Sequence, residues 1–361
     1  MAKVKSTTDW LAQLVACRSD GTEEALVALL ARCLEPWGAR LTIQTVHPGR
    51  PNFIATFPGR DATRSLMLEA HSDTVGGEGT FTPTVRDGKL YGRGACDTKG
   101  AMAAMLSGIE TVLAEQGRPP VTVHFVSTCN EELGATGAHH LVANGFRADY
   151  AVVGEPTDRR IVYAHKGSLR LRLHTQGVAA HSSAPERGVN AIYKMCRVVQ
   201  ALETNVIPKL AEVRDAVLGS PTLSVGTIHG GSQVNVVPAA CEIEVDRRLL
   251  PGEERDAVVA GILGALPGDI SHRMTEYYPP LGQDPGSPLV QRVGRAAGEM
   301  RLATAAWASN AGVFAAAGIP AVLFGPGSIQ QAHTEEEFIE VAQVEAASRV
   351  YAEIIRQSAE P

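Results

Sequence analysis

Residues 66–73 read Leu-Met-Leu-Glu-Ala-His-Ser-Asp, a short apolar run that ends in a polar cluster. Such a run is typical of a buried strand. Farther along the chain, Gly100 to about Glu115 carries apolar residues at helical spacing, and Val121–Thr128 again resembles a strand. This alternation predicts an α/β fold with a mostly parallel, mixed sheet and helices on both faces.

The pattern changes near residue 166, where strictly alternating segments begin. The residue pattern predicts strands at about 168–175, 222–228, 240–248 and 271–277 and helices at about 188–204 and 253–263. Along the chain the order is strand, helix, strand, strand, helix and strand. This order is that of an α+β, ferredoxin-like domain. From about residue 280 the α/β character returns. We therefore expect a catalytic domain of residues 1–166 and 278–361, interrupted by an inserted lid domain of residues 167–277.

The bulk composition narrows the classes of protein. The chain has 361 residues, a formal net charge of −6 and 44% hydrophobic residues, which suits a two-domain globular protein. The mild acidity gives no reason to expect nucleic acid as a partner. The chain has neither an apolar run of membrane-spanning length nor a secretory leader at its start, so no membrane partner is expected. Its six cysteines form no CxxC pair and predict free thiols in a reducing cytoplasm.

Side chains that bind metals cluster just beyond the predicted strands. In an open α/β sheet, the carboxyl ends of the strands line the crevice where ligands bind. Two imidazoles and three carboxylates suit a pair of divalent ions such as zinc. The candidate ligands are His71, Asp97, Glu132, Glu155 and His333. Two adjacent cations need a shared anion, and Asp97, in the glycine-rich stretch Gly92–Gly100, is the expected bridge.

Two further carboxylates have expected roles beside the metals. Asp73, two residues after His71, is placed to accept the other ring N–H of a ligating imidazole. Glu131 precedes Glu132, and neighbouring side chains leave the backbone in different directions. One can therefore bind metal while the other faces substrate as a general base.

Two competing interpretations of these segments are weaker. The glycine-rich loop lacks the G-x-G-x-x-G and Walker patterns, so a nucleotide site is not expected. A cysteine hydrolase using Cys129 would need a histidine partner beyond those already assigned to metal.

The motifs together resemble a known family. The resemblance covers nearly the whole chain. It is carried by the segments Leu68–Val75, Gly92–Met105, Asn130–Gly134, Gly154–Thr157, Gly318–Gly327 and Ala332–Phe338. They are similar to the zinc-dependent amidohydrolases and metallopeptidases that include acetylornithine deacetylase, succinyl-diaminopimelate desuccinylase and glutamate carboxypeptidase.

The resemblance implies a division of roles among the ligands. His71 and Glu155 would bind one ion, Glu132 and His333 the other, and Asp97 would lie between them. Zinc is the expected metal, with cobalt or manganese as alternatives. Relatives often have a cis peptide bond beside the bridging aspartate, which here is Asp97-Thr98.

The lid segment resembles the family as well. His181, in Gly177-Val-Ala-Ala-His-Ser-Ser, would hydrogen-bond the scissile carbonyl in the active site of a second copy, which implies a homodimer formed through the lid. The stretch that contains Asn235, and Arg248 after it, resembles the segment that binds the substrate carboxylate; Arg248 is preferred to Arg247. Gly327 completes the expected substrate-binding set.

The expected reaction is hydrolysis of an N-acyl amino acid, with dipeptidase or carboxypeptidase activity as the alternative. A catalytically silent homologue would have lost ligands, and here all five are present. Two departures stand out: Asn130 precedes the glutamate pair, and Asn310 replaces an acidic residue near the expected side-chain pocket.

Overall fold

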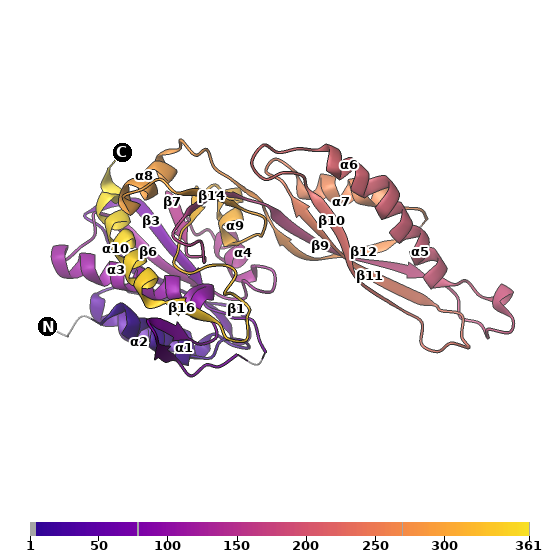
Figure 1. Cartoon of the computed structure of the whole chain (residues 1–361), viewed down its shortest axis with the longest axis horizontal. Coiled ribbons are helices and arrows are strands. Elements are labelled where there is room, and N and C mark those ends of the chain that lie inside the picture. The colour runs from indigo at the N-terminus through magenta and orange to yellow at the C-terminus, as the bar shows by residue number, and fades with distance from the viewer. Residues whose placement is uncertain (1–4, 78, 269, 361) are drawn as a thin grey trace. The chain divides into compact units, whose positions relative to one another are not determined.

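A computed structural model describes residues 5–77, 79–268 and 270–360 (Figure 1). The chain divides into two compact units. The larger unit comprises Met1–Ala164, Gly282–Thr304 and Ser309–Pro361, and the smaller unit comprises His165–Leu281 and Ala305–Ala308. The smaller unit is thus an insertion in the larger one.

A nine-stranded sheet, counted over the described residues, forms the centre of the larger unit, in the order β1-β2-β6-β3-β7-β15-β8-β13 with β14 beside β8. The strands are β1 (Arg40–His47), β2 (Arg50–Phe57), β3 (Asp61–His71), β6 (Val121–Thr128), β7 (Tyr150–Val153), β8 (Ile161–His165), β13 (Leu281–Gly282), β14 (Leu302–Ala305) and β15 (Ala321–Leu323). The neighbours β6, β3, β7 and β15 run parallel, and β1, β2 and β8 are antiparallel to their neighbours. This sheet confirms the predicted fold class.

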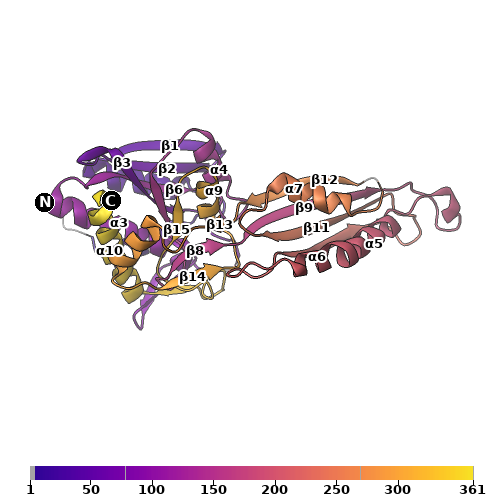
Figure 2. The same ribbon diagram turned by 90° about the horizontal axis from the view of Figure 1, so that it is seen from above.

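Helices cover both faces of this sheet (Figure 2). One face is covered by α1 (Thr7–Ala16), α2 (Glu24–Leu34), α3 (Gly100–Gln116), α8 (Pro288–Ala297) and α10 (Val341–Arg356), whose apolar residues share one buried cluster. On the other face, α4 (Thr136–Ala143) and α9 (Asn310–Ala316) contact each other.

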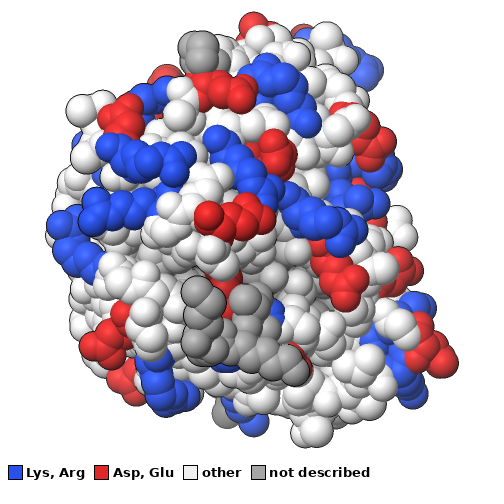
Figure 3. All heavy atoms as spheres, turned by 90° about the vertical axis from the view of Figure 1, so that its left-hand side faces the viewer, with Lys and Arg blue, Asp and Glu red and all other residues white. Residues whose placement is uncertain are grey.

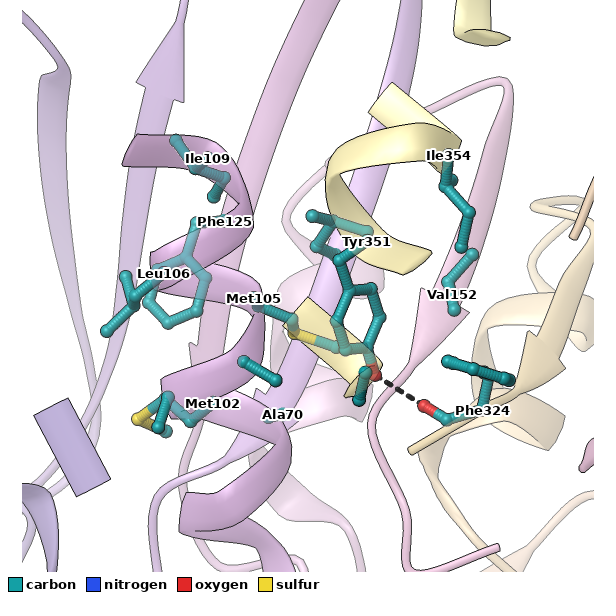
Figure 4. Packing of buried hydrophobic residues seen from close by; sticks show 14 of the residues in the cluster. Ala70, Met102, Met105, Leu106, Ile109, Phe125, Val152, Phe324, Tyr351 and Ile354 are labelled. Atoms are coloured by element: carbon teal, nitrogen blue, oxygen red, sulfur yellow. Dashed lines mark hydrogen bonds between the residues drawn. The ribbon is translucent and has the colours of Figure 1, made fainter. Parts of the chain in front are cut away.

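Helix α3 packs beside α10 against the sheet. Figure 4 shows Met105 of α3 beside Tyr351 of α10, with Met102 and Leu106 on the other side of α3. The Tyr351 hydroxyl donates to the backbone oxygen of Phe324 at 2.5 Å. These side chains are fully buried. The close packing of α3 holds in place the irregular helical turn before it, η2 (Ala95–Lys99), which contains Asp97.

A small sheet joins two segments that are distant in the sequence. Its strands are β4 (Thr84–Arg86), β5 (Lys89–Tyr91) and β16 (Phe338–Glu340), in the order β16-β5-β4. Pairing of β16 with β5 brings the chain after His333 beside the chain before Asp97.

The smaller unit has the predicted ferredoxin-like topology. Its antiparallel sheet has the order β10-β11-β9-β12, formed by β9 (Gly167–Gln176), β10 (Thr222–Gly230), β11 (Ala240–Leu249) and β12 (Ser271–Tyr278). The helices α5 (Ala191–Ala201), α6 (Ile207–Glu212) and α7 (Arg255–Gly264) lie on one face of it (Figure 1). The helical segment that was expected to end near residue 204 continues through an irregular turn, η4 (Leu202–Val206), into α6.

The other face of this sheet carries charged side chains in alternating register. Arg170 on β9 pairs with Asp246 on β11 at 3.2 Å and with Glu276 on β12 at 2.7 Å. Arg172 pairs with Glu244 at 2.6 Å. Because every second residue of a strand points to the same face, these ion pairs form one layer that suits contact with water.

The surface carries charges of both signs. On the face of the molecule drawn in Figure 3, lysines and arginines alternate with aspartates and glutamates. Among the described residues, no helix combines the length and the apolar character that a membrane crossing requires.

Candidate metal centre

The predicted ligands of the larger unit follow its parallel strands. His71 is the last residue of β3, Glu132 lies shortly after β6, and Glu155 follows β7. In the sheet, β6 and β7 lie on opposite sides of β3, although both follow it in the chain. Such a reversal of strand order opens a crevice at the carboxyl ends of the strands.

Three of the predicted ligands meet closely. One candidate ligand atom from each of His71, Asp97 and Glu132 lies within 4.8 Å of the others. His71 Nε2 is 2.9 Å from Asp97 Oδ1. The peptide bond between Asp97 and Thr98 is cis, as the resemblance implied.

His333 approaches Asp97 from the other side. Its Nε2 lies 3.3 Å from Asp97 Oδ2 and 3.0 Å from Glu132 Oε1. The two oxygens of Asp97 therefore face two different imidazoles, which is the arrangement a bridging carboxylate needs. His333 itself has a positive φ of 61° and a half-exposed side chain.

The remaining predicted ligand, Glu155, is buried beside this group. Burial raises its pKa well above the usual value, and the charge of Asp97 adds to the rise. Glu155 is not one of the three residues within 4.8 Å. Glu155 follows β7, which pairs in parallel with β3, so it lies at the same edge of the sheet as His71.

The electrostatics of the site favour bound cations. Hydrogen bonds to Asp97 and Glu132 raise the pKa of His333 to about 10. Burial alone would lower the pKa of His71, but the neighbouring carboxylates raise it well above its usual value. Both imidazoles thus take up positive charge to offset the acidic groups, and a divalent cation would serve the same purpose.

Glu131 is buried next to the ligands. Burial raises its pKa well above the usual value; the charge of His71 partly offsets this rise, and that of Glu155 adds to it. A carboxyl group with a raised pKa beside a metal site can both take up and release a proton near neutral pH.

Asp73 contacts the site through both its backbone and its side chain. The Nδ1–H of His71 donates to the backbone oxygen of Asp73 at 3.0 Å, whereas the Asp73 carboxylate is 3.6 Å away. That carboxylate instead accepts the backbone N–H groups of Glu131 at 2.9 Å and Glu132 at 3.0 Å. Asp73 therefore orients His71 through its backbone and the glutamate pair through its side chain.

The two departures from the family pattern have structural explanations. Asn130 has a positive φ of 56° and donates to the hydroxyl of Thr136 at 2.9 Å, which stabilises the turn before α4. Asn310 is buried, and its amide nitrogen donates to Glu69 Oε1 and Thr128 Oγ1, each at 3.0 Å. It belongs to an interior polar cluster with Glu69 and Thr128.

Gly327 and the residues of the smaller unit also have defined surroundings. Gly327 has a φ of 82°, and a Cβ there would lie 2.6 Å from Cys96 Sγ, so both backbone and space require glycine. In the smaller unit, the exposed His181 pairs through its backbone with Val236, and Ser182 N donates to the backbone oxygen of Asn235 at 3.0 Å. The structure thus brings the two segments that carry His181 and Asn235 together.

The imidazole of His181 has a defined tautomer when neutral. The backbone N–H of Ser183 donates to its Nδ1 at 3.1 Å. Nδ1 is therefore an acceptor, and the ring proton lies on Nε2.

The two neighbouring arginines differ sharply in accessibility. Arg247 is 1% exposed and forms an ion pair with Glu253. Arg248 is partly exposed and pairs with Asp246 at 2.8 Å on the charged sheet face. Only the second of the two guanidinium groups can therefore meet a ligand from solvent.

Comparison with known proteins gives a consistent result. The sequence profile of Peptidase family M20/M25/M40 matches residues 67–357. Acetylornithine deacetylases from Proteus mirabilis and Klebsiella pneumoniae are 33% and 31% identical to the chain, over 94% and 93% of its length and 91% of theirs.

Solved structures share the fold. Aminopeptidase PepT from Bacillus cereus has a TM-score of 0.79 at 25% identity, with 98% of each chain covered. A dinuclear metal-binding peptidase from Bacillus subtilis has a TM-score of 0.72 at 16% identity, with 97% of this chain and 96% of that one covered.

Proposed function

The chain belongs to Peptidase family M20/M25/M40, and from this premise we propose that it hydrolyses the amide bond of an N-acyl amino acid. The products would be a carboxylate and a free amino acid. The observation that carries the proposal is the 33% identity to an acetylornithine deacetylase over 94% of the chain. Dipeptide hydrolysis is the second candidate, because proteins of the same fold include an aminopeptidase.

We assign two divalent metal ions, zinc in the first place, to the centre in the larger unit. His71 and Glu155 would hold one ion, Glu132 and His333 the other, and Asp97 both. The two oxygens of Asp97, each facing a different imidazole, support this assignment. Such ions polarise the scissile carbonyl and make water acidic enough to lose a proton near neutral pH.

Glu131 is the proposed general base and acid. It would accept a proton from the attacking water and return it to the amine nitrogen as the C–N bond breaks. Its burial beside the ligands raises its pKa, which favours uptake of a proton. Asp73, through the two backbone N–H groups that it accepts, would fix the direction in which Glu131 points.

The smaller unit would supply residues that bind the substrate. Arg248 would pair with the substrate carboxylate, and Asn235 would also bind the substrate. Gly327, in the larger unit, completes the proposed substrate-binding set. His181, with its proton on Nε2, would donate a hydrogen bond to the scissile carbonyl oxygen. We further propose a homodimer formed through the smaller unit, in which His181 serves the active site of the other copy.

We also propose a cytoplasmic location. All six cysteines are free thiols in the structure, which suits a reducing compartment.

The test is a substrate screen with zinc- and cobalt-loaded protein. Acetylated and succinylated amino acids are compared with dipeptides, and the released amino acid is identified. Hydrolysis of dipeptides without hydrolysis of any acyl amino acid would reject the first candidate in favour of the second.

A Glu131→Gln variant tests the assigned chemistry. Turnover should fall by about 10²–10⁴-fold, the usual effect of losing acid–base catalysis, while metal content stays unchanged. Glu336→Gln, at an exposed glutamate, is the matched control and should retain wild-type turnover. Near-normal turnover in Glu131→Gln would reject the role of Glu131.

A further inference from the structure

Glu337 is a buried carboxylate with a complete set of hydrogen-bond donors. Its Oε1 accepts the backbone N–H groups of Cys96 at 2.9 Å and Asp97 at 3.0 Å. Its Oε2 accepts the backbone N–H of Gly94 and the Arg93 guanidinium, each at 2.9 Å. The Glu337 residue is only 2% exposed. Each oxygen therefore has two donors, and all four belong to one five-residue stretch, Arg93 to Asp97.

This loop needs an external acceptor because its backbone is irregular. Gly94 adopts the left-handed conformation with φ 81°, and Asp97 has a non-helical φ of −119° inside the turn η2. Backbone N–H groups in such a turn lack the regular partners of a helix, and buried donors without partners are costly. The Glu337 carboxylate accepts three of these backbone N–H groups, those of Gly94, Cys96 and Asp97, the last being the proposed bridging ligand.

Glu337 also anchors the segment that carries His333. Residues 329–337 form neither helix nor strand, so no backbone ladder fixes His333 in place. Glu337 lies four residues after His333, and its backbone oxygen accepts the N–H of Gly92 at 2.9 Å. Strand β16 begins at the next residue and pairs with β5. The side chain and the backbone of Glu337 thus fasten this segment to the Asp97 loop.

We propose that Glu337 is a positioning residue of the metal centre, which sets the placement of Asp97 relative to His333. This inference rests on the proposed metal-dependent function, because it concerns two of the proposed ligands. Glu337 does not contact either ligand side chain in a way that would make it a ligand itself. Glu337 instead joins the loop that carries Asp97 to the segment that carries His333. A small displacement of either segment would alter the space between these two side chains.

Glutamine is a sharp probe of this role. It has nearly the shape of glutamate, and its one oxygen can still accept two of the N–H groups. Its amide nitrogen would face the other two donors and could accept from neither. Half of the loop contacts would therefore be lost without a change in side-chain volume.

The experiment compares Glu337→Gln with Glu336→Gln, a neighbouring exposed glutamate that serves as the matched control. Metal-free protein is titrated with Zn²⁺ and Co²⁺ against a chelator, and the visible spectrum of the cobalt form is recorded. We expect Glu337→Gln to bind at least one ion about 10–100-fold more weakly, the usual effect of losing an outer partner of a ligand, and to change the cobalt spectrum. Glu336→Gln should match the wild type.

Further measurements separate positioning from a purely structural role. If metal-free Glu337→Gln melts at a lower temperature but binds both ions with wild-type affinity and spectrum, the proposal is overturned. If Glu337→Gln does not fold, Glu337→Asp keeps the charge and withdraws the carboxylate by one methylene, and the same two outcomes decide. A wild-type protein that binds no metal would instead reject the proposed function itself.

Discussion

Replacing Asn310 by aspartate should place two carboxylates against each other in the interior of the larger unit. The Asn310 amide donates to Glu69 Oε1 and Thr128 Oγ1, each at 3.0 Å, and both Glu69 and Asn310 are almost fully buried. Asn310→Asp removes both donated bonds and brings an oxygen to the position of the amide nitrogen. The substitution is nearly isosteric, so packing should change little.

The expected loss follows from these contacts. Two unit charges at this distance repel each other by about 5 kcal/mol at an effective dielectric constant of about 20. Loss of a hydrogen bond to a charged group costs about 1.5–3 kcal/mol more. Uptake of a proton by the pair relieves part of this, so we expect a net destabilisation of about 3–5 kcal/mol at about pH 8, the usual range for a broken buried pair.

The loss should depend on pH in a definite direction. Burial already raises the pKa of Glu69 to about 7 in the wild type, and a second carboxylate beside it raises the first protonation of the pair further. A carboxyl group whose folded pKa is raised destabilises the fold above that pKa, and the penalty disappears as pH falls toward its unfolded value. At about pH 5, where one carboxyl group is protonated and can donate to the other, the loss should shrink to about 1–2 kcal/mol.

Urea denaturation followed by tryptophan fluorescence measures the effect. Trp10 and Trp37 lie in the larger unit with ring centroids 5.7 Å apart, so they report on its unfolding. The control is the exchanged pair Glu69→Gln with Asn310→Asp, which moves the amide from α9 to β3 and should recover most of the loss. A single variant as stable as the wild type at about pH 8, where the pair should carry its full penalty, would refute the argument.

Two further predictions concern other sites. Burial, assisted by the charge of Arg40, lowers the pKa of His124 to about 4, so the fold is stabilised above the usual histidine pKa and loses this contribution as pH falls toward 4. Between about pH 7 and pH 4, the free energy of unfolding should therefore fall by about 3 kcal/mol less in His124→Gln than in the wild type. Urea titrations at the two pH values measure both falls, and an equal fall in the two proteins would contradict the prediction. Arg248→Lys should raise KM for substrates with a free carboxylate by about 10-fold or more, because an ammonium cannot reproduce the forked contact. The same variant should process a carboxamide analogue as the wild type does, and equal effects on both substrates would argue against carboxylate binding.

Much of the fold could be predicted from local patterns. Helical spacing predicted α3, and alternation predicted the four strands of the smaller unit. Placement of His71, Glu132 and Glu155 after strands follows from the same patterns, because parallel strands end at one edge of a sheet. These features depend on residues close in sequence, where periodicity is informative.

The contacts that the sequence does not reveal join irregular segments far apart in the chain. Nothing in the order of residues shows that Glu337 accepts hydrogen bonds from the loop before Asp97, or that Glu69 faces Asn310. The additional contact of the His71 ring with the backbone oxygen of Asp73 depends on the exact course of one turn, which the sequence does not reveal. For the contact between Glu69 and Asn310, the one available signal was the position of Glu69 within an apolar run. A carboxylate buried in such a run requires a polar partner.

The ion pairs on the open sheet face of the smaller unit have a consequence for how this surface can diverge among homologues. Arg170 is shared by Asp246 on one neighbouring strand and Glu276 on the other. Reversing the charge at Arg170 alone would create two like-charged neighbours, whereas changing either acid alone leaves one attractive pair intact. Positions 246 and 276 should therefore vary independently while position 170 stays basic, and an acidic residue at 170 should occur only together with changes at both of the others.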